Sequence, residues 1–319
     1  MQHGLIFYYI CRMKKILTLT ALLLSVLATE TINAQTKTTL KFAQRDTCDL
    51  FLDLYMPTDT ALLAENKPLI LFAFGGGFYS GERDAKDYIE WFNALNAKGY
   101  PVASMDYRLG LKGVKYAKNL KFVAKLEHAV DIAVEDMYSA TNYLLENAKD
   151  LCLEGRGIVI SGSSAGAMTS LQAEYYIAND AEIAKVLPEG FNYAGVMSFS
   201  GAVFSKKGNV TYAKTPCPQL LLHGMLDRMV TYKQIKMLGM CLGGSSHIAK
   251  QLAKAGYNYQ ILRFTNNYHE ICVSMMRNLD KELEFLSRNV EKGENIIIDA
   301  VITDPEIKIP DWATTPAVE

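Results

Sequence analysis

Hydrophobic residues occur along this chain in short continuous runs, separated by longer stretches in which apolar residues recur at helical spacing. The run PLILFAF (68–74) has no charged position, which is typical of a strand that is buried on both faces of a parallel sheet. Between residues 127 and 149, apolar residues recur every three or four positions, as on the buried face of a long helix. The pattern therefore predicts strands and helices in alternation.

Two runs near the start differ from the others, because polar and apolar residues alternate in them, with Leu50, Leu52 and Leu54 on one face. This alternation predicts an antiparallel strand pair ahead of a parallel sheet. The predicted strands lie at residues 38–44, 49–57, 68–74, 100–107, 155–161, 193–200, 217–224 and 258–264. The predicted helices lie at about 84–98, 127–149, 165–178, 231–255 and 271–292. The order predicts an α/β fold with a mainly parallel central sheet and helices on both faces, so we expect functional residues just after the strands.

The first residues have the pattern of an export signal. Two lysines follow Met13, a short apolar run covers residues 16–27, and Ala34 offers a small residue for cleavage. The apolar run is shorter than the ~20 residues that span a bilayer. The alternative to a signal peptide is a buried N-terminal helix. We expect a signal peptide over residues 1–34, starting at Met13, and a single domain over residues 35–319. The mature protein is then periplasmic or extracellular, without stable membrane insertion.

Composition narrows the possible partners. The chain has 319 residues, 50% hydrophobic and 21% charged, with a net charge of -1. It has no basic stripe, so we expect no nucleic-acid partner. Five cysteines follow the signal segment, an odd number that leaves at least one thiol free, and export would allow one disulfide. No two of them have the close spacing of a zinc site, and the sequence implies no particular oligomeric state.

The stretch ISGSSAGAM (160–168) holds three candidate nucleophiles. Ser164 has glycines two positions before and two positions after it, so residues 162–166 match G-x-S-x-G between a predicted strand and a predicted helix. A turn this sharp needs tiny residues at both places, and Ser161 and Ser163 lack them. The alternative is a serine that only caps the helix. The spacing favours Ser164 as the nucleophile.

Candidate partners follow three other predicted strands. The loop FGGGFYSG (74–81) can bring backbone amides close to a substrate, where they would hold a developing oxyanion. A phosphate-binding loop is an alternative, but the Lys-Ser or Lys-Thr ending is absent; a plain turn is another. Asp227 lies in HGMLDRMV (223–230), and His269 is the only histidine of TNNYHEI. The chain order Ser164, Asp227, His269 is the one expected for a nucleophile, an acid and a base on this architecture.

Together, these motifs resemble the α/β-hydrolase superfamily, and within it the carboxylesterase-like and hormone-sensitive-lipase-like small esterases. GGGFYSG resembles the oxyanion loop of carboxylesterases and cholinesterases, MDYRLG (105–110) resembles a segment that these enzymes carry, and HGMLDRMV resembles the acid loop of many small esterases. The resemblance spans about residues 40–292. Phe74 departs from it, because many relatives have a histidine there. The chain is also much shorter than cholinesterases, so their gorge is not carried over.

The resemblance implies an α/β-hydrolase fold and a serine carboxylic-ester hydrolase that works through an acyl-enzyme, without a metal or an organic cofactor. Ser164 would be the nucleophile, His269 the base and Asp227 the orienting acid. The oxyanion would be held by the backbone amides of Gly76, Gly77 and Ala165. The substrate would be a small-molecule or saccharide-linked ester, such as an acyl or feruloyl group on a polysaccharide. A serine peptidase and a non-catalytic binding protein of the same fold are the alternatives.

Four further parts of the chain carry expectations. Phe78 and Tyr79 line the acyl pocket or serve only in packing, and Arg108 ties the 106–110 turn to its surroundings. The segment 109–127 either roofs the site or is a solvated loop. The tail 293–319, which is outside the resemblance, adds an edge strand or an interface.

Overall fold

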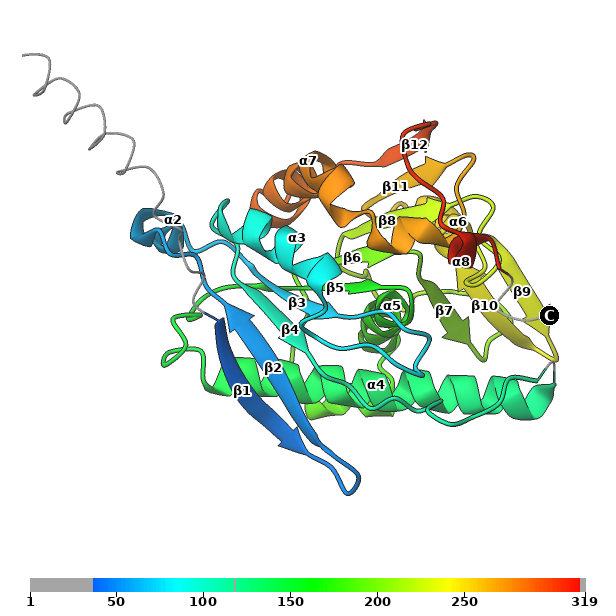
Figure 1. Ribbon diagram of the computed structural model, residues 1–319, viewed down its shortest axis with the longest axis horizontal. Helices are drawn as coiled ribbons and strands as arrows, with labels where there is room; N and C mark the ends of the chain where they lie inside the picture. The colour runs from blue at the N-terminus through cyan, green and yellow to red at the C-terminus, as the bar shows by residue number, and fades with distance from the viewer. Residues whose placement is uncertain (1–36, 118, 316–319) are drawn as a thin grey trace, which may run out of the picture. The chain divides into compact units, whose positions relative to one another are not determined.

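The computed structural model describes residues 37–117 and 119–315 (Figure 1). These residues form a central sheet of nine strands. Its order is β1-β2-β4-β3-β5-β6-β8-β11-β12. The strand bounds are β1 Lys37–Gln44, β2 Asp49–Tyr55, β3 Leu69–Ala73, β4 Val102–Met105, β5 Ile158–Ser163, β6 Gly195–Phe199, β8 Gln219–Gly224, β11 Tyr259–Phe264 and β12 Ile298–Ile302. The pairs β1–β2 and β2–β4 are antiparallel and the other pairs in this sheet are parallel. The predicted fold class is confirmed.

Helices cover both faces of this sheet, as buried strands such as β3 require. Figure 1 shows α4 and α5 on one face, where they pack together, and α3 and α7 on the other. The helix bounds are α2 Thr60–Ala64, α3 Lys86–Asn96, α4 Leu120–Glu146, α5 Ala165–Ile177, α6 Ser245–Ala255, α7 Met275–Phe285 and α8 Asp311–Thr314. Two 3-10 segments are η1 Glu182–Val186 and η2 His269–Val273, and η3 Leu286–Glu291 is a π-helix.

The prediction of one helix over 231–255 was wrong in its first half. Residues there form β9 Gln234–Met237 and β10 Met240–Gly244, which pair with each other. Strand β10 also pairs with β7 Ala202–Ser205, so the three form a small antiparallel sheet. Leu238 and Gly239 have φ angles of 48° and 80°, the left-handed conformation of a two-residue hairpin turn. The side chains of β9 are exposed, so the strand has no buried face that the hydrophobic pattern would reveal.

Two other predicted helices differ in their bounds. Helix α4 begins at Leu120 rather than near 127, because the side chain of Asn119 accepts a hydrogen bond of 2.9 Å from the Phe122 amide and caps the helix. The helix predicted at 271–292 consists of η2, α7 and η3 in succession. The tail that follows supplies the edge strand β12, which pairs with β11, and the short helix α8.

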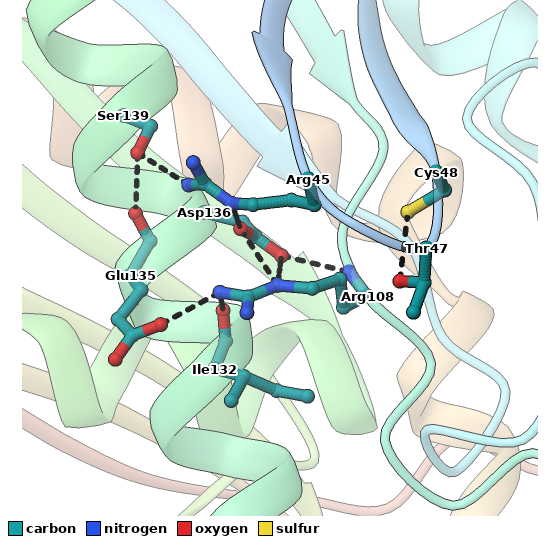
Figure 2. A network of polar contacts seen from close by, with 8 residues as sticks. All are labelled: Arg45, Thr47, Cys48, Arg108, Ile132, Glu135, Asp136 and Ser139. Carbon is teal, nitrogen blue, oxygen red and sulfur yellow. Dashed lines mark hydrogen bonds and ion pairs between the residues drawn. The ribbon is translucent and has the colours of Figure 1, made fainter.

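An ionic network joins the N-terminal strand pair and the turn after β4 to α4 (Figure 2). The side chain of Asp136 on α4 is fully buried and accepts hydrogen bonds of 2.9 Å from both Arg45 Nε and Arg108 Nε. The guanidinium of Arg45 also reaches Ser139, and that of Arg108 reaches Glu135 at 2.7 Å. Arg108 therefore has the structural role that the sequence predicts.

The structure tests only some of the expectations about the N-terminal segment, the membrane and the cysteines. The proposed signal peptide over residues 1–34 is not among them. No helix in the described part of the chain is long and apolar enough to cross a membrane. The five cysteines in that part of the chain are all free thiols, so the disulfide that export would allow is not formed there.

Candidate active site

Ser164 stands at a sharp turn between β5 and α5, with φ 50° and ψ -110°. A side chain on Gly162 would place its Cβ 2.2 Å from the carbonyl carbon of Gly166, and one on Gly166 would meet the Ala73 carbonyl oxygen at 2.0 Å. Both contacts are closer than any real Cβ contact, so the turn requires glycine at both positions. The strained backbone of a nucleophile elbow is therefore centred on Ser164 rather than on its serine neighbours.

The three side chains that the sequence singles out meet in one hydrogen-bonded chain. Ser164 Oγ lies 2.8 Å from His269 Nε2, and His269 Nδ1 lies 2.7 Å from Asp227 Oδ2. An ionised carboxylate only accepts hydrogen bonds, so we assign the proton of a neutral His269 to Nδ1. His269 Nε2 is then free to accept the proton of the Ser164 hydroxyl. This is the geometry of a nucleophile, a base and an orienting acid.

Neighbouring strands bring Asp227 and His269 together. They follow β8 and β11, which run parallel and side by side, so the loops after both strands emerge at the same edge of the sheet. A Cβ on Gly224 would lie 2.1 Å from the Tyr268 carbonyl oxygen, so the two loops touch where glycine leaves room. Backbone amides after the acid, including that of Val230 at 3.0 Å, hold Asp227 Oδ1 in place.

A second histidine contacts the acid. His223 Nε2 lies 3.1 Å from Asp227 Oδ2 and 3.2 Å from the Val230 carbonyl oxygen, which can only accept, so Nε2 carries a proton. His223 Nδ1 lies 2.8 Å from Ser245 Oγ at the start of α6. This contact extends the chain of hydrogen bonds to Ser245, and His223 and His269 both contact Oδ2 of Asp227.

The environment shifts the pKa values of the acid and the base in opposite directions. Burial raises the pKa of Asp227, but hydrogen bonds from His223 and His269 lower it more, so that the carboxyl stays ionised. Burial lowers the pKa of His269, whereas its neighbours Cys272 and Asp227 raise it, and the net shift is upward from 6.5. A base with a raised pKa attracts the serine proton more strongly, provided that it is neutral before the reaction.

Backbone amides that would hold an oxyanion lie beside Ser164. The Gly75 amide donates to the Tyr88 hydroxyl at 3.1 Å, whereas no acceptor within the described residues takes the amides of Gly76 and Gly77. These two glycines have φ angles of 123° and 65°, a conformation that side chains rarely adopt. Ala165 is the first residue of α5, so its amide has no partner within the helix. The three predicted oxyanion donors thus line the same cavity as Ser164.

Phe74 stands directly before the glycines of the loop, at the position where the sequence departs from the esterase motif. Its contacts with Tyr107 hold the loop in place. Its ring stacks on Tyr107 with centroids 4.4 Å apart, and the Tyr107 hydroxyl donates to the Phe74 carbonyl at 2.8 Å. The buried ring of Phe78 meets the edge of Tyr107 at 6.1 Å. An aromatic pair therefore anchors the loop where relatives have a histidine.

One family model and two curated esterases match part of this chain. A family model described as BD-FAE matches residues 52–203, which include the glycine loop and Ser164. Esterase LipI of Mycobacterium tuberculosis is 30% identical over 113 residues, which are 35% of this chain and 30% of that protein. Carboxylesterase NlhH of the same species is 27% identical over 118 residues, 37% of this chain and 31% of that protein. The match thus spans about a third of the length of these curated relatives.

Solved structures share the fold over most of this chain. A thermophilic esterase of the planctomycete Thermogutta terrifontis, in its native form, has a TM-score of 0.58 at 21% identity and covers 81% of this chain and 92% of its own. The same esterase with propionate bound has a TM-score of 0.57 at 20% identity, covering 79% and 93%. This chain has the α/β-hydrolase fold, and the proteins that it matches are named as esterases.

Within this α/β-hydrolase fold, Ser164 and His269 line a cavity of about 530 Å³. Phe78 and Tyr79 line it, and the buried ring of Phe78 also packs on Tyr107. The segment 109–127 also contributes to the wall, which favours the roof over a solvated loop. Its residues in the wall are Leu111, Tyr116, Phe122 and Leu126.

One wall residue was missed by the sequence analysis. Trp312 on α8 lines the cavity, and its ring centroid lies 6.4 Å from that of His269. The tail carries no helical or alternating pattern that would place it at the site. A lone tryptophan in a polar tail, half-exposed at 45%, is the signal that was available.

Proposed function

We propose that this α/β-hydrolase is a serine carboxylic-ester hydrolase. The chain of contacts from Ser164 through His269 to Asp227 carries the proposal, because it gives a serine hydroxyl a base that is already oriented. The amides of Gly76 and Gly77, which have no acceptor among the described residues, support it, since each oxyanion donor contributes about 3–4 kcal/mol to transition-state stabilisation.

The reaction proceeds in two steps. Neutral His269 accepts the hydroxyl proton of Ser164 while Ser164 Oγ attacks the ester carbonyl, and Asp227 stabilises the resulting imidazolium. The carbonyl oxygen becomes an oxyanion that accepts hydrogen bonds from backbone amides of the glycine loop and of Ala165. His269 then donates its proton to the departing alcohol, which leaves an acyl group on Ser164. Water, deprotonated by His269, releases the acid in the same way.

The finer proposal concerns the substrate and the location. We infer an exported enzyme, periplasmic or extracellular, that removes acyl or feruloyl groups from polysaccharides. The export-signal pattern of residues 1–34 and the size of the cavity, about 530 Å³, support it. The Thermogutta terrifontis esterase has been seen with propionate and with butyrate bound, so a short acyl group is a reasonable first substrate for this chain as well.

The activity is tested with matched chromogenic substrates. Short p-nitrophenyl esters should be hydrolysed and aminoacyl p-nitroanilides should not, because the proposal is for an esterase rather than a peptidase. A fluorophosphonate probe should label one peptide, at Ser164. Cleavage of the anilides alone would indicate a peptidase, and absence of both labelling and hydrolysis would indicate a binding protein.

Export is tested by producing the full chain in a bacterial host and sequencing the N-terminus of the secreted or periplasmic protein. We expect the mature protein to begin at Gln35. Recovery of the chain only from the cytosol, with residues 13–34 still attached, would contradict the proposal.

A further inference from the structure

The tail after β12 returns to the active site. Helix α8 contacts η2, the segment that begins with His269 (Figure 1). Ala313 is fully buried and anchors α8, and Arg277 on α7 pairs with Asp304 of the tail. Trp312 is therefore held beside the base, with its ring at 86° to the imidazole of His269.

The position beside His269 is the alcohol side of an ester. When the ester bond breaks, the alcohol oxygen must take its proton from His269 Nε2, so the alcohol portion lies next to this histidine. Trp312 lines the cavity at that place. Its indole therefore faces the alcohol portion of the substrate rather than the oxyanion.

The exposure of the indole indicates what kind of alcohol it accepts. Trp312 is 45% exposed, so a ligand that covers its apolar face still has water on its own outer side. A sugar ring fits both conditions, because one face presents C–H groups and the rim presents hydroxyls. An alkyl alcohol has no ring to stack on the indole, and an aromatic alcohol would leave its own outer face apolar.

We propose that Trp312 is a specificity-determining residue that binds the saccharide portion of the ester. The inference rests on the proposed esterase function and assigns the residue that recognises the saccharide of its substrate. Tyr116 offers a matched control, since it is a cavity-lining aromatic that is 36% exposed and packs on Phe122 at 4.6 Å. No ring contact joins Tyr116 to His269 among the described residues.

The first experiment varies the alcohol while the acyl group stays acetyl. Hydrolysis of an acetylated methyl glucoside, phenyl acetate and ethyl acetate is followed by pH-stat. In Trp312→Ala, the ratio of kcat/KM for the glucoside to that for ethyl acetate should fall about tenfold. Trp312→Phe, which keeps a ring, should restore most of the ratio, and Tyr116→Ala should keep it.

Two outcomes would overturn the proposal. An equal loss on all three acetates in Trp312→Ala, not restored by phenylalanine, would mean that the residue only supports the fold. A loss confined to phenyl acetate would mean that the occupant is an aromatic alcohol.

The second experiment measures binding without turnover. The chain has two tryptophans, and Trp91 is fully buried with its indole nitrogen on Glu282 at 2.6 Å, so changes in emission on binding report Trp312. Titrating the Ser164→Ala variant with the acetylated glucoside should shift the emission to shorter wavelength. The double variant Ser164→Ala/Trp312→Phe should show no shift.

These readouts separate the two proposals. If the wild-type protein hydrolyses no ester, the proposed function fails, while an emission shift would still support a saccharide at Trp312. If it hydrolyses ethyl acetate but the emission does not change, the function stands and the inference about Trp312 fails.

Discussion

Some polar groups near the end of β5 have no hydrogen-bond partner within the described part of the chain, whereas the carboxylate at the centre of the network around Asp136 is hydrogen-bonded on both oxygens. At β5, Ser164 has a strained backbone, and the nearby amides of Gly76 and Gly77 have no acceptor among the described residues. Around Asp136, the buried carboxylate is bonded to both Arg45 and Arg108 and to an amide (Figure 2).

The turn at Ser164 lowers the stability of the fold, whereas the network around Asp136 holds the fold together. Unpaired donors and positive φ angles cost free energy and persist where a substrate can use them. A fully bonded buried ion pair instead fixes the strand pair β1–β2 against α4, and breaking it leaves a charge without a partner. Substitutions should therefore affect activity in the first region and the free energy of unfolding in the second.

The largest effect is expected for Ser164→Ala. Removing the nucleophile should abolish ester hydrolysis, as a loss of about 10⁶-fold in kcat in a serine protease suggests. Ser161→Ala is the matched control, because Ser161 is buried on the same strand and does not line the cavity; it should retain most activity. Initial rates on p-nitrophenyl acetate measure both. Probe labelling at Ser163 instead of Ser164 would contradict the assignment of the elbow.

Asp227→Asn should reduce kcat by about 10⁴-fold and leave the protein folded, by analogy with the triad aspartate of serine proteases. Asp106→Asn is the control, since Asp106 also follows a strand but binds Arg83 at 2.8 Å. Rates and circular dichroism are measured together. Near wild-type turnover of a folded Asp227→Asn protein would mean that another carboxylate orients His269.

Asp136→Asn should act on stability alone. It leaves Arg45 without its buried anion and Arg108 with Glu135 alone, and because both guanidiniums are partly exposed the loss should be about 1.5–3 kcal/mol of unfolding free energy. Asp180→Asn, which removes only an exposed ion pair with Lys214, should cost less than about 1 kcal/mol. Urea unfolding measures both variants, and kcat per folded molecule should not change. A loss of kcat in folded Asp136→Asn protein would remove the contrast between the two regions.

The smallest effect concerns pH. His269 must be neutral to accept a proton, and its pKa is raised, so kcat/KM should increase with pH along a single-proton limb whose midpoint lies above about 6.5. Asp227→Asn removes a charge that favours the imidazolium and should move the limb to lower pH. A chelator should leave the rate unchanged. A flat profile between about pH 5 and 9 would rule out a histidine base.

Most of the fold and the core of the site could be predicted from the sequence, because both rest on local patterns. Continuous apolar runs mark buried strands, and the glycines around Ser164 satisfy a steric demand that can be recognised within five residues. The β9–β10 hairpin could not be predicted, because β9 is exposed and its pairing with β10 depends on a turn. Trp312 was missed since its contact with His269 joins segments that no sequence period relates.

Trp312, which adds to the wall beside His269, comes from a segment that shares no strand or helix with Ser164, Asp227 or His269. This segment, residues 303–315, contains neither the turn at Ser164 nor the loop after β8. Selection for a new substrate thus has a region to act on that leaves the chemistry intact. Chains of common ancestry would be expected to diverge faster in this tail than at the turn around Ser164, and exchanging the tail between them would show how far it sets the choice of substrate.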